Sequence, residues 1–208
     1  MKIIVDMMGG DRAPEETVKG ICQAAQEFNA SYILVGNQQE IERAAAENQL
    51  DIRRFDIVHT EQAISMEDDP LCVVRTKTES SMAVGMKLLA EGKGDAFVSA
   101  GNTGALFTGA TLIVRKIKGV SRAGIGTILP FQNPVLLLDT GANVTVTEEN
   151  LEQFGVMGAA YMRGMYGIDR PRVGLLNNGA ESCKGTALQQ AAFRLLSENP
   201  EINFVGNI

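Results

Sequence analysis

The feature that most constrains the fold is an alternation of short apolar runs with longer segments whose apolar residues recur at helical spacing. This alternation is typical of β-α units, in which helices connect and cover parallel strands. The expected strands are residues 2–6, 32–35, 54–59, 95–99, 126–129, 135–138, 172–176 and 202–205. The expected helices are residues 15–28, 39–48, 73–91, 103–116, 151–166 and 187–198. We therefore predict a three-layer α/β/α fold with a mostly parallel sheet, in a single α/β domain over residues 1–208.

The charge and cysteine content limit the classes of partner and the compartment. The formal net charge is −6, which argues against a nucleic-acid binder, because such proteins need a basic face. A local basic pocket could still hold a small anion. Cys22, Cys72 and Cys183 have no metal-ligand spacing and indicate a reducing, cytoplasmic location. We find no signal peptide and no apolar run of the roughly 18 residues that span a membrane.

Four glycine-containing turns each follow an expected strand. They are residues 6–11, residues 99–104, residues 139–143, and residues 177–179 with the following Lys184 and Gly185. Glycine lets the backbone approach a ligand closely, and a turn that opens into a helix directs unpaired N–H groups at an anion. Ligands of open α/β sheets lie beyond the carboxyl ends of the strands. The four turns together predict an anion or phosphate pocket at one edge of the sheet.

A different interpretation applies to any one of these turns alone. Strand-to-helix turns use Gly, Asn, Asp and Ser for local geometry in every α/β protein. None of the four fits the dinucleotide fingerprint or the Walker pattern, which weakens both nucleotide readings. Residues 204–208 run from a strand into a glycine turn where the chain stops, and we expect the chain to be incomplete at its C-terminus.

The residues around these turns resemble a known family. The stretches that carry the resemblance are residues 5–11 with Ala13 and Pro14, Met66, Asp69, Pro70, Arg75, Lys77, residues 80–82, 98–106, 137–139, 141–144, 174–177, 184–185 and 205–208. In this order they are similar to the bacterial phosphate acyltransferases of the PlsX family. Met7 and Arg12 depart from the family pattern, which usually has Ala and His there. Thr140 and residues 180–183 depart from it as well.

This resemblance implies an enzyme that transfers a fatty acyl group from an acyl carrier protein thioester to inorganic phosphate, early in phospholipid synthesis. It implies no cofactor, no metal and no covalent enzyme intermediate. The implied fold is Rossmann-like and related to the phosphate acetyltransferase and isocitrate dehydrogenase-like group. The implied partners are a second copy of the chain in a homodimer and a downstream glycerol-3-phosphate acyltransferase, with peripheral association at the inner face of the membrane. The alternatives are a short-chain phosphotransacylase acting on acyl-CoA and a noncatalytic phosphate-binding module.

Within that reaction, the turns supply the candidate site. We expect Lys184 to be the cation for phosphate or the oxyanion, and Asn102 and Asn177 to donate amide hydrogen bonds in catalysis. The expected phosphate- and substrate-binding residues are Asp6, Gly9, Gly10, Ser99, Gly101, Thr103, Asp139, Gly141 and Asn143. For Asp6 and Asp139 the preferred interpretation is that they brace turns or orient a donor, since a bare carboxylate would repel phosphate.

Several other residues have a structural and a functional interpretation. His59, the only histidine, is expected to be structural, because no serine elbow accompanies it. Cys183 lies beside Lys184 and has a nucleophilic role as its alternative, but a structural role is preferred. Met157, Met162 and Met165 are expected to pack the core, with an acyl-chain site as the alternative. Arg115, Lys116, Lys118 and Arg122 form the basic run, which is either a solvated helix end or a docking site for an acidic carrier protein.

Overall fold

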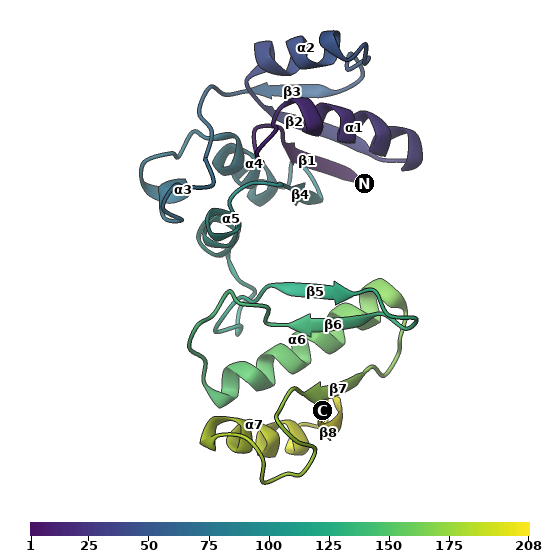
Figure 1. Ribbon diagram of the computed structural model, residues 1–208, viewed down its shortest axis with the longest axis vertical. Coiled ribbons are helices and arrows are strands. Elements are labelled where there is room, and N and C mark those ends of the chain that lie inside the picture. Colours follow the sequence, from purple (N-terminus) through teal and green to yellow (C-terminus); the bar gives the residue numbers. More distant parts are fainter. The chain divides into compact units, whose positions relative to one another are not determined.

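The computed structural model describes residues 1–208, which divide into two units, Met1–Lys116 and Ile117–Ile208. Figure 1 labels the elements of both units along the chain. The single domain expected from the sequence stays a prediction. None of the helices combines the length and the apolar character that crossing a membrane requires.

The first unit is built on a sheet of four parallel strands. These are β1 (Lys2–Asp6), β2 (Ser31–Gly36), β3 (Asp56–His59) and β4 (Ala96–Val98), in the order β3-β2-β1-β4. In the register of the sheet, Ile4 of β1 lies between Ile33 of β2 and Phe97 of β4. Because β1 and β4 are neighbours, the carboxyl ends of two strands 90 residues apart in the sequence meet at one edge.

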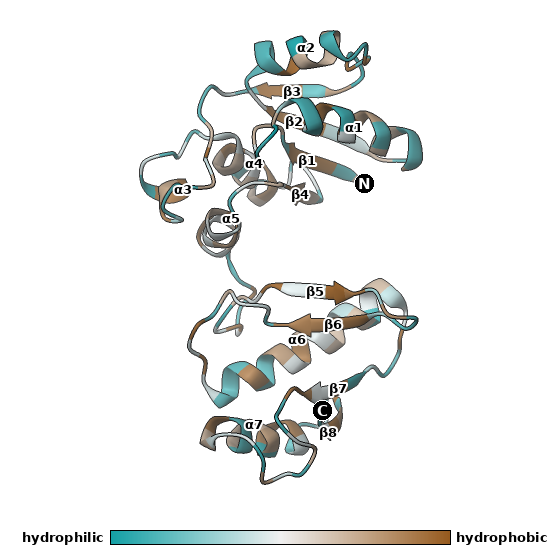
Figure 2. Ribbon diagram, viewed as in Figure 1, coloured by the Kyte–Doolittle hydropathy of each residue, from teal (hydrophilic) through white to brown (hydrophobic).

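Helices cover both faces of this sheet. The helices α1 (Glu15–Glu27) and α2 (Gln38–Glu47) share a core with Tyr32 and Leu34 of β2. The alternate residues of the same strand, Ile33 and Val35, pack with the side chains of α4 (Ser81–Ala90). This alternation follows from the two-residue period of a strand. In Figure 2 the strands β1 and β2 are largely brown, whereas the helices α1 and α2 are mixed teal and brown.

The predicted helix at residues 73–91 was wrong in its extent. Two helices occupy this stretch, α3 (Cys72–Arg75) and α4, and they are separated by residues 76–80. Ser80 is the N-cap of α4, and its side chain accepts a hydrogen bond from the N–H of Ala83. Serine and threonine side chains compete for backbone hydrogen bonds in this way, which favours a new helix start over continuation. The predicted helix at residues 103–116 is α5 (Thr103–Gly109) followed by a π-helix, η1 (Ala110–Arg115).

The second unit has two pairs of strands and two long helices. The strands β5 (Gly126–Leu129) and β6 (Val135–Leu138) are antiparallel, because five connecting residues allow a hairpin but no crossover. The strands β7 (Arg172–Leu175) and β8 (Asn203–Asn207) are parallel. The helix α6 (Glu148–Tyr166) packs against α7 (Ala187–Glu198) over a core that includes Leu175, Ala192 and Leu196. The expected α/β class with mostly parallel strands is therefore confirmed.

The end of the chain differs from its prediction. A glycine turn was expected at Gly206, but β8 continues through this residue to Asn207. Gly206 has a φ of 98°, and the pairing between β7 and β8 shifts register between Val173 and Leu175. The glycine therefore accommodates an irregularity inside the strand, which a single sequence cannot distinguish from a turn.

Candidate functional site

The first glycine turn begins at a buried carboxylate. Asp6, the last residue of β1, is only 2% exposed. Its Oδ1 accepts hydrogen bonds from Ser81 Oγ at 2.6 Å and from the N–H of Met8 at 3.1 Å. Its Oδ2 accepts a hydrogen bond from Ser99 Oγ at 2.7 Å. Asp6 therefore joins the end of β1 to the start of α4 and to the loop that follows β4.

The second glycine turn lies directly against the first. Ser99 Oγ also accepts a hydrogen bond from the N–H of Gly101 at 3.1 Å. A Cβ added to Gly9 would lie 2.6 Å from Asp6 Oδ2, 2.7 Å from Ser99 Oγ and 2.9 Å from Gly101 N. No side chain fits at residue 9, and the two turns meet only because it is glycine. Gly10 follows with a φ of 110°.

Asn102 is buried, and the protein itself occupies its amide group. Nδ2 donates to the carbonyl oxygens of Ser65, Met66 and Asp68 at 3.0–3.2 Å. Oδ1 accepts from the N–H of Ala105 and caps α5. These contacts are those of a bracing residue, so the expected donation to substrate stays a prediction. Thr103, the first residue of α5, is exposed.

The acidic loop at residues 60–71 is held in place by an ion pair. Lys77 Nζ donates to Asp68 Oδ2 at 2.6 Å and to the carbonyl oxygen of Ala63 at 2.9 Å. The N–H of Ser65 also donates to Asp68 Oδ2, at 2.6 Å. The hydrogen bond from Lys77 is the main cause of a pKa of Asp68 below its usual value. The loop that binds Asn102 is thus itself fixed by charge.

The third turn belongs to the second unit and is organised by Asp139. Its two carboxylate oxygens accept hydrogen bonds from the N–H groups of Ile125, Ala142 and Asn143 and from Asn143 Nδ2, at 2.8–3.2 Å. Burial acts to raise the pKa of Asp139, but the hydrogen bonds from Ile125, Asn143 and Ala142 outweigh it and lower the pKa. Gly141 has a φ of 109°. Asp139 therefore braces the turn, and its expected part in substrate binding stays a prediction.

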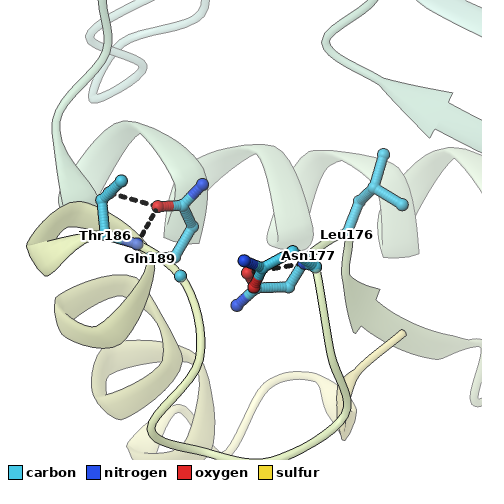
Figure 3. A pocket seen from close by; sticks show the side chains of 6 residues that line it. Leu176, Asn177, Thr186 and Gln189 are labelled. Atoms are coloured by element: carbon cyan, nitrogen blue, oxygen red, sulfur yellow. Dashed lines mark hydrogen bonds between the residues drawn. The ribbon is translucent and has the colours of Figure 1, made fainter.

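The fourth turn borders a hollow of about 610 Å³ at the start of α7. The hollow is lined by Leu176, Asn177, Asn178, Gly185, Thr186 and Gln189. Figure 3 labels Leu176, Asn177, Thr186 and Gln189 among them. Gln189 Oε1 accepts hydrogen bonds from the hydroxyl and the N–H of Thr186, which is the N-cap of α7. Asn177 Nδ2 donates to the carbonyl oxygen of Lys184 at 3.2 Å. A Cβ on Gly185 would lie 2.6 Å from Asn177 Oδ1, so glycine is needed for this close approach.

Lys184 is exposed on the same turn as Gly185. Its N–H donates to the carbonyl oxygen of Glu181 at 3.0 Å, and its side chain passes close to Gly179, where an added Cβ would lie 2.9 Å from Lys184 Cγ. No ion pair includes Lys184, and the carboxylate of Glu181 borders the same glycine, with Oε2 3.0 Å from the added Cβ. This turn therefore combines a cation with the N-terminus of a twelve-residue helix.

The structure brings together some of the expected site residues within each unit. In the first unit, Asp6, Gly9, Ser99 and Gly101 form one cluster. In the second unit, Asp139 bonds Asn143, and Asn177 contacts the backbone of Lys184 and Gly185. The roles of these residues in binding or catalysis stay predictions.

Two functional candidates were missed by reasoning from the sequence. Ser81 makes the shortest hydrogen bond to Asp6. Lys77 fixes the loop that holds Asn102. Both residues contributed to the family resemblance, but neither was given a role. No local pattern could have found the pairing of Asp6 with Ser81, because 75 residues separate them.

The single histidine, the methionines of α6 and Cys183 differ in burial and in hydrogen bonding. His59 Nδ1 accepts a hydrogen bond from the N–H of Gln38, which fits the structural interpretation. Met162 is buried and belongs to the interior, whereas Met165 is 67% exposed. Cys183 is exposed. The methionines therefore do not all pack the core.

Two solved structures have a similar fold. A EutD phosphotransacetylase from Staphylococcus aureus matches with a TM-score of 0.71 and 21% identity, covering 99% of this chain and 68% of that chain. A phosphotransacetylase from Streptococcus pyogenes matches with a TM-score of 0.75 and 17% identity, covering 100% of this chain and 68% of that chain. At these identities the likeness supports the fold alone, and it confirms the expected fold kinship with phosphate acetyltransferases.

Sequence relatives extend over the whole chain. The phosphate acyltransferases of Thermotoga neapolitana, Acetivibrio thermocellus and Dictyoglomus turgidum are 48%, 46% and 44% identical to it over 209, 210 and 210 residues. The chain spans 61% of the length of the first relative and 62% of the length of the other two. The sequence model of the family described as fatty acid synthesis protein matches residues 1–208. The resemblance inferred from the sequence is confirmed, and the chain belongs to this family of fatty acid synthesis proteins, the PlsX phosphate acyltransferases.

Proposed function

We propose that the protein containing this chain transfers a fatty acyl group from an acyl carrier protein thioester to inorganic phosphate. The products are an acyl phosphate and free carrier protein. The observation that carries this proposal is the match of the family model over residues 1–208, together with similar relatives that are named phosphate acyltransferases. The chain covers less than two thirds of those relatives, so the reaction is proposed for the full-length protein.

The reaction requires the phosphate and the thioester to be positioned and the developing oxyanion to be stabilised. A phosphate oxygen attacks the thioester carbonyl carbon, and a tetrahedral oxyanion forms. The carbon–sulfur bond then breaks, and the carrier leaves as a thiolate that takes up a proton from water. Phosphate is already a nucleophile near neutral pH and the thiolate leaves readily, so catalysis needs only orientation and donors aimed at the oxyanion.

The hollow at the start of α7 suits the anions of this reaction. The free N–H groups of a helix N-terminus attract negative charge, and the ammonium group of Lys184 lies on the turn leading into this helix. Asn177 lines the hollow beside Gly185. These features support Lys184 and Asn177 as the residues that bind phosphate or stabilise the oxyanion.

Two carboxylates hold the turns in place. Asp6 accepts hydrogen bonds from Ser99, which holds the first two turns together, and from Ser81 of α4. Asp139 accepts hydrogen bonds from N–H groups of the third turn. We assign both as bracing residues.

The direct test uses the full-length protein with fatty acyl carrier protein and phosphate, and measures the acyl phosphate formed. Replacing Lys184 by Ala should raise the KM for phosphate or lower kcat by at least tenfold. Lys93→Ala is the matched control, because Lys93 is exposed and lies outside the candidate site. Unchanged kinetics of Lys184→Ala would remove that residue from the site while leaving the reaction in place.

Two other functions give different results in the same assay. A short-chain phosphotransacylase would prefer acyl-CoA over the carrier-bound thioester. A noncatalytic phosphate-binding module would show no phosphate-dependent cleavage of either thioester. The homodimer, the supply of acyl phosphate to a glycerol-3-phosphate acyltransferase and peripheral membrane association belong to this proposal, and family membership supports them.

A further inference from the structure

A short loop at the start of the second unit is fixed on the surface of α6. Gln153 Oε1 accepts hydrogen bonds from the N–H and the hydroxyl of Ser121 at 2.9 and 2.8 Å. Gln153 Nε2 donates to the carbonyl oxygen of Gly119, and Asn150 Nδ2 donates to Ser121 Oγ at 2.8 Å. We call residues 117–122 the basic loop. Its backbone is thus held in one conformation before any partner arrives.

The basic loop presents apolar and cationic side chains to solvent. Ile117 is 80% exposed, and Lys118 and Arg122 are also exposed. The loop contains no Asp or Glu, and neither Lys118 nor Arg122 is in a salt bridge. In a chain with a formal net charge of −6, the loop carries two positive side chains and no negative one, while the first turn of α6, to which it is hydrogen-bonded, carries Glu148 and Glu149. Such a surface attracts an acidic partner in spite of the sign of the whole protein.

The basic loop is also connected to a candidate site residue. Arg122 Nη1 approaches Asn143 Oδ1 at 3.5 Å. Asn143 in turn donates to Asp139 Oδ2 and to the carbonyl oxygen of Ala123. A partner seated on the loop would therefore be one side chain away from the third glycine turn. This turn contains Gly141 and Asn143, which are among the expected substrate-binding residues.

We propose that the basic loop is a docking surface for the acidic face of the acyl carrier protein. This inference rests on the proposed function, because that function makes an acidic carrier the donor of the acyl group. Lys118 and Arg122 pair with carboxylates of the carrier, and Ile117 packs against apolar side chains exposed between them. Charge pairs of this kind raise the rate of encounter and fix the register, while the apolar contact slows dissociation.

The test measures how reversing the charge of Lys118 affects the reaction with each of two thioester donors. In the full-length protein, Lys118→Glu and the double variant Ile117→Ser, Lys118→Glu are assayed with fatty acyl carrier protein and with the carrier-free acyl pantetheine thioester. Lys93→Glu, in the first unit, is the control for the change in net charge. We expect the KM for the carrier-bound donor to rise about tenfold for Lys118→Glu and further for the double variant. The kinetics with the carrier-free donor, kcat and the KM for phosphate should stay at the wild-type values.

Direct binding separates this proposal from the proposed function. Fluorescence anisotropy of labelled acyl carrier protein should show weaker binding to both variants, with the difference shrinking as salt is raised. Acyl phosphate formation with unchanged carrier binding in the variants would overturn the docking surface and leave the function. If the carrier binds in a way that depends on the loop but the wild type forms no acyl phosphate, the docking surface stands and the proposed function is overturned. Equal losses of activity with both thioester donors would also overturn the docking proposal. Variants that lose binding to vesicles containing anionic phospholipid, but keep binding to the carrier, would overturn it too.

Discussion

Ser99 donates a hydrogen bond to Asp6 at 2.7 Å across 93 residues of sequence. Asp6 ends β1, and Ser99 follows the neighbouring strand β4. Their contact holds the first two glycine turns together. The carboxylate is buried and receives donors from Ser81 and Met8 as well. The shape of this sheet edge therefore depends on one buried carboxyl group that accepts three hydrogen bonds.

Replacing Asp6 by Ala should destabilise the protein by about 2–3 kcal/mol, because buried donors lose a charged acceptor and remain unsatisfied. The free energy of unfolding in urea measures this loss. Asp11→Ala is the control, since Asp11 is exposed and its loss should change stability by less than about 0.5 kcal/mol. Equal effects of the two substitutions would contradict a structural role for the buried carboxylate.

Two helical glycines have opposite surroundings and should respond in opposite directions to alanine. A Cβ on Gly85 of α4 would lie 2.3 Å from Phe97 of β4, whereas a Cβ on Gly20 of α1 meets nothing within 4 Å. Gly85→Ala should lower the free energy of unfolding by about 1–3 kcal/mol through overpacking. Gly20→Ala should raise it by up to about 1 kcal/mol, because alanine favours the helix. Thermal unfolding of the two variants side by side tests both values, and a stabilised Gly85→Ala would be inconsistent with this packing of α4.

The sequence predicted the elements whose signals are local. Strands such as β1 and helices such as α7 follow from periodicity, and α7 was predicted with the bounds that the structure has. The break before Ser80 was missed because the apolar period continues on both sides of it, while one side-chain cap decides where α4 begins. The antiparallel pairing of β5 with β6 was not stated, although the short connection implies it.

The candidate site was predicted less completely, because its contacts are between residues far apart in the sequence. The glycines at positions 9 and 101 were identified, but the reason for glycine at position 9 is the oxygen atoms of Asp6 and Ser99. The amide of Asn102 looked available in the sequence, yet three carbonyl groups of a loop 34–37 residues away occupy it. Local patterns indicate which residue types gather at a sheet edge, and only the fold decides which atoms remain free.

The ion pair between Asp68 and Lys77 should make stability depend on pH. The pKa of Asp68 is lowered in the folded state, chiefly by the hydrogen bond from Lys77. Its contribution is therefore present above the unfolded-state pKa of about 3.9 and is lost as the pH falls through the folded-state value. Asp68→Asn should lower the free energy of unfolding at pH 7, and the difference from the wild type should shrink below about pH 4.

Urea unfolding of the wild type and Asp68→Asn across pH 2.5–7 measures this convergence. Glu67→Gln, at an exposed neighbouring position, is the control for the loss of one negative charge, and its unfolding curve should follow that of the wild type. A gap between Asp68→Asn and the wild type that stays constant over the whole range would show that ionisation of Asp68 does not stabilise the loop.

Alanine substitutions at Gly185 and Gly167 distinguish the effect of backbone strain from the effect of disturbing the hollow at the start of α7. Both have positive φ, 83° and 65°, so alanine at either position should cost about 1–2 kcal/mol of strain. A Cβ at Gly185 would also lie 2.6 Å from Asn177 Oδ1, while a Cβ at Gly167 meets nothing within 4 Å. In the full-length protein, Gly185→Ala should therefore displace Asn177 and raise the KM for phosphate several-fold, whereas Gly167→Ala should lower stability alone. If the two variants have the same KM for phosphate at temperatures where both are folded, the close approach of Gly185 to Asn177 is not part of the phosphate site.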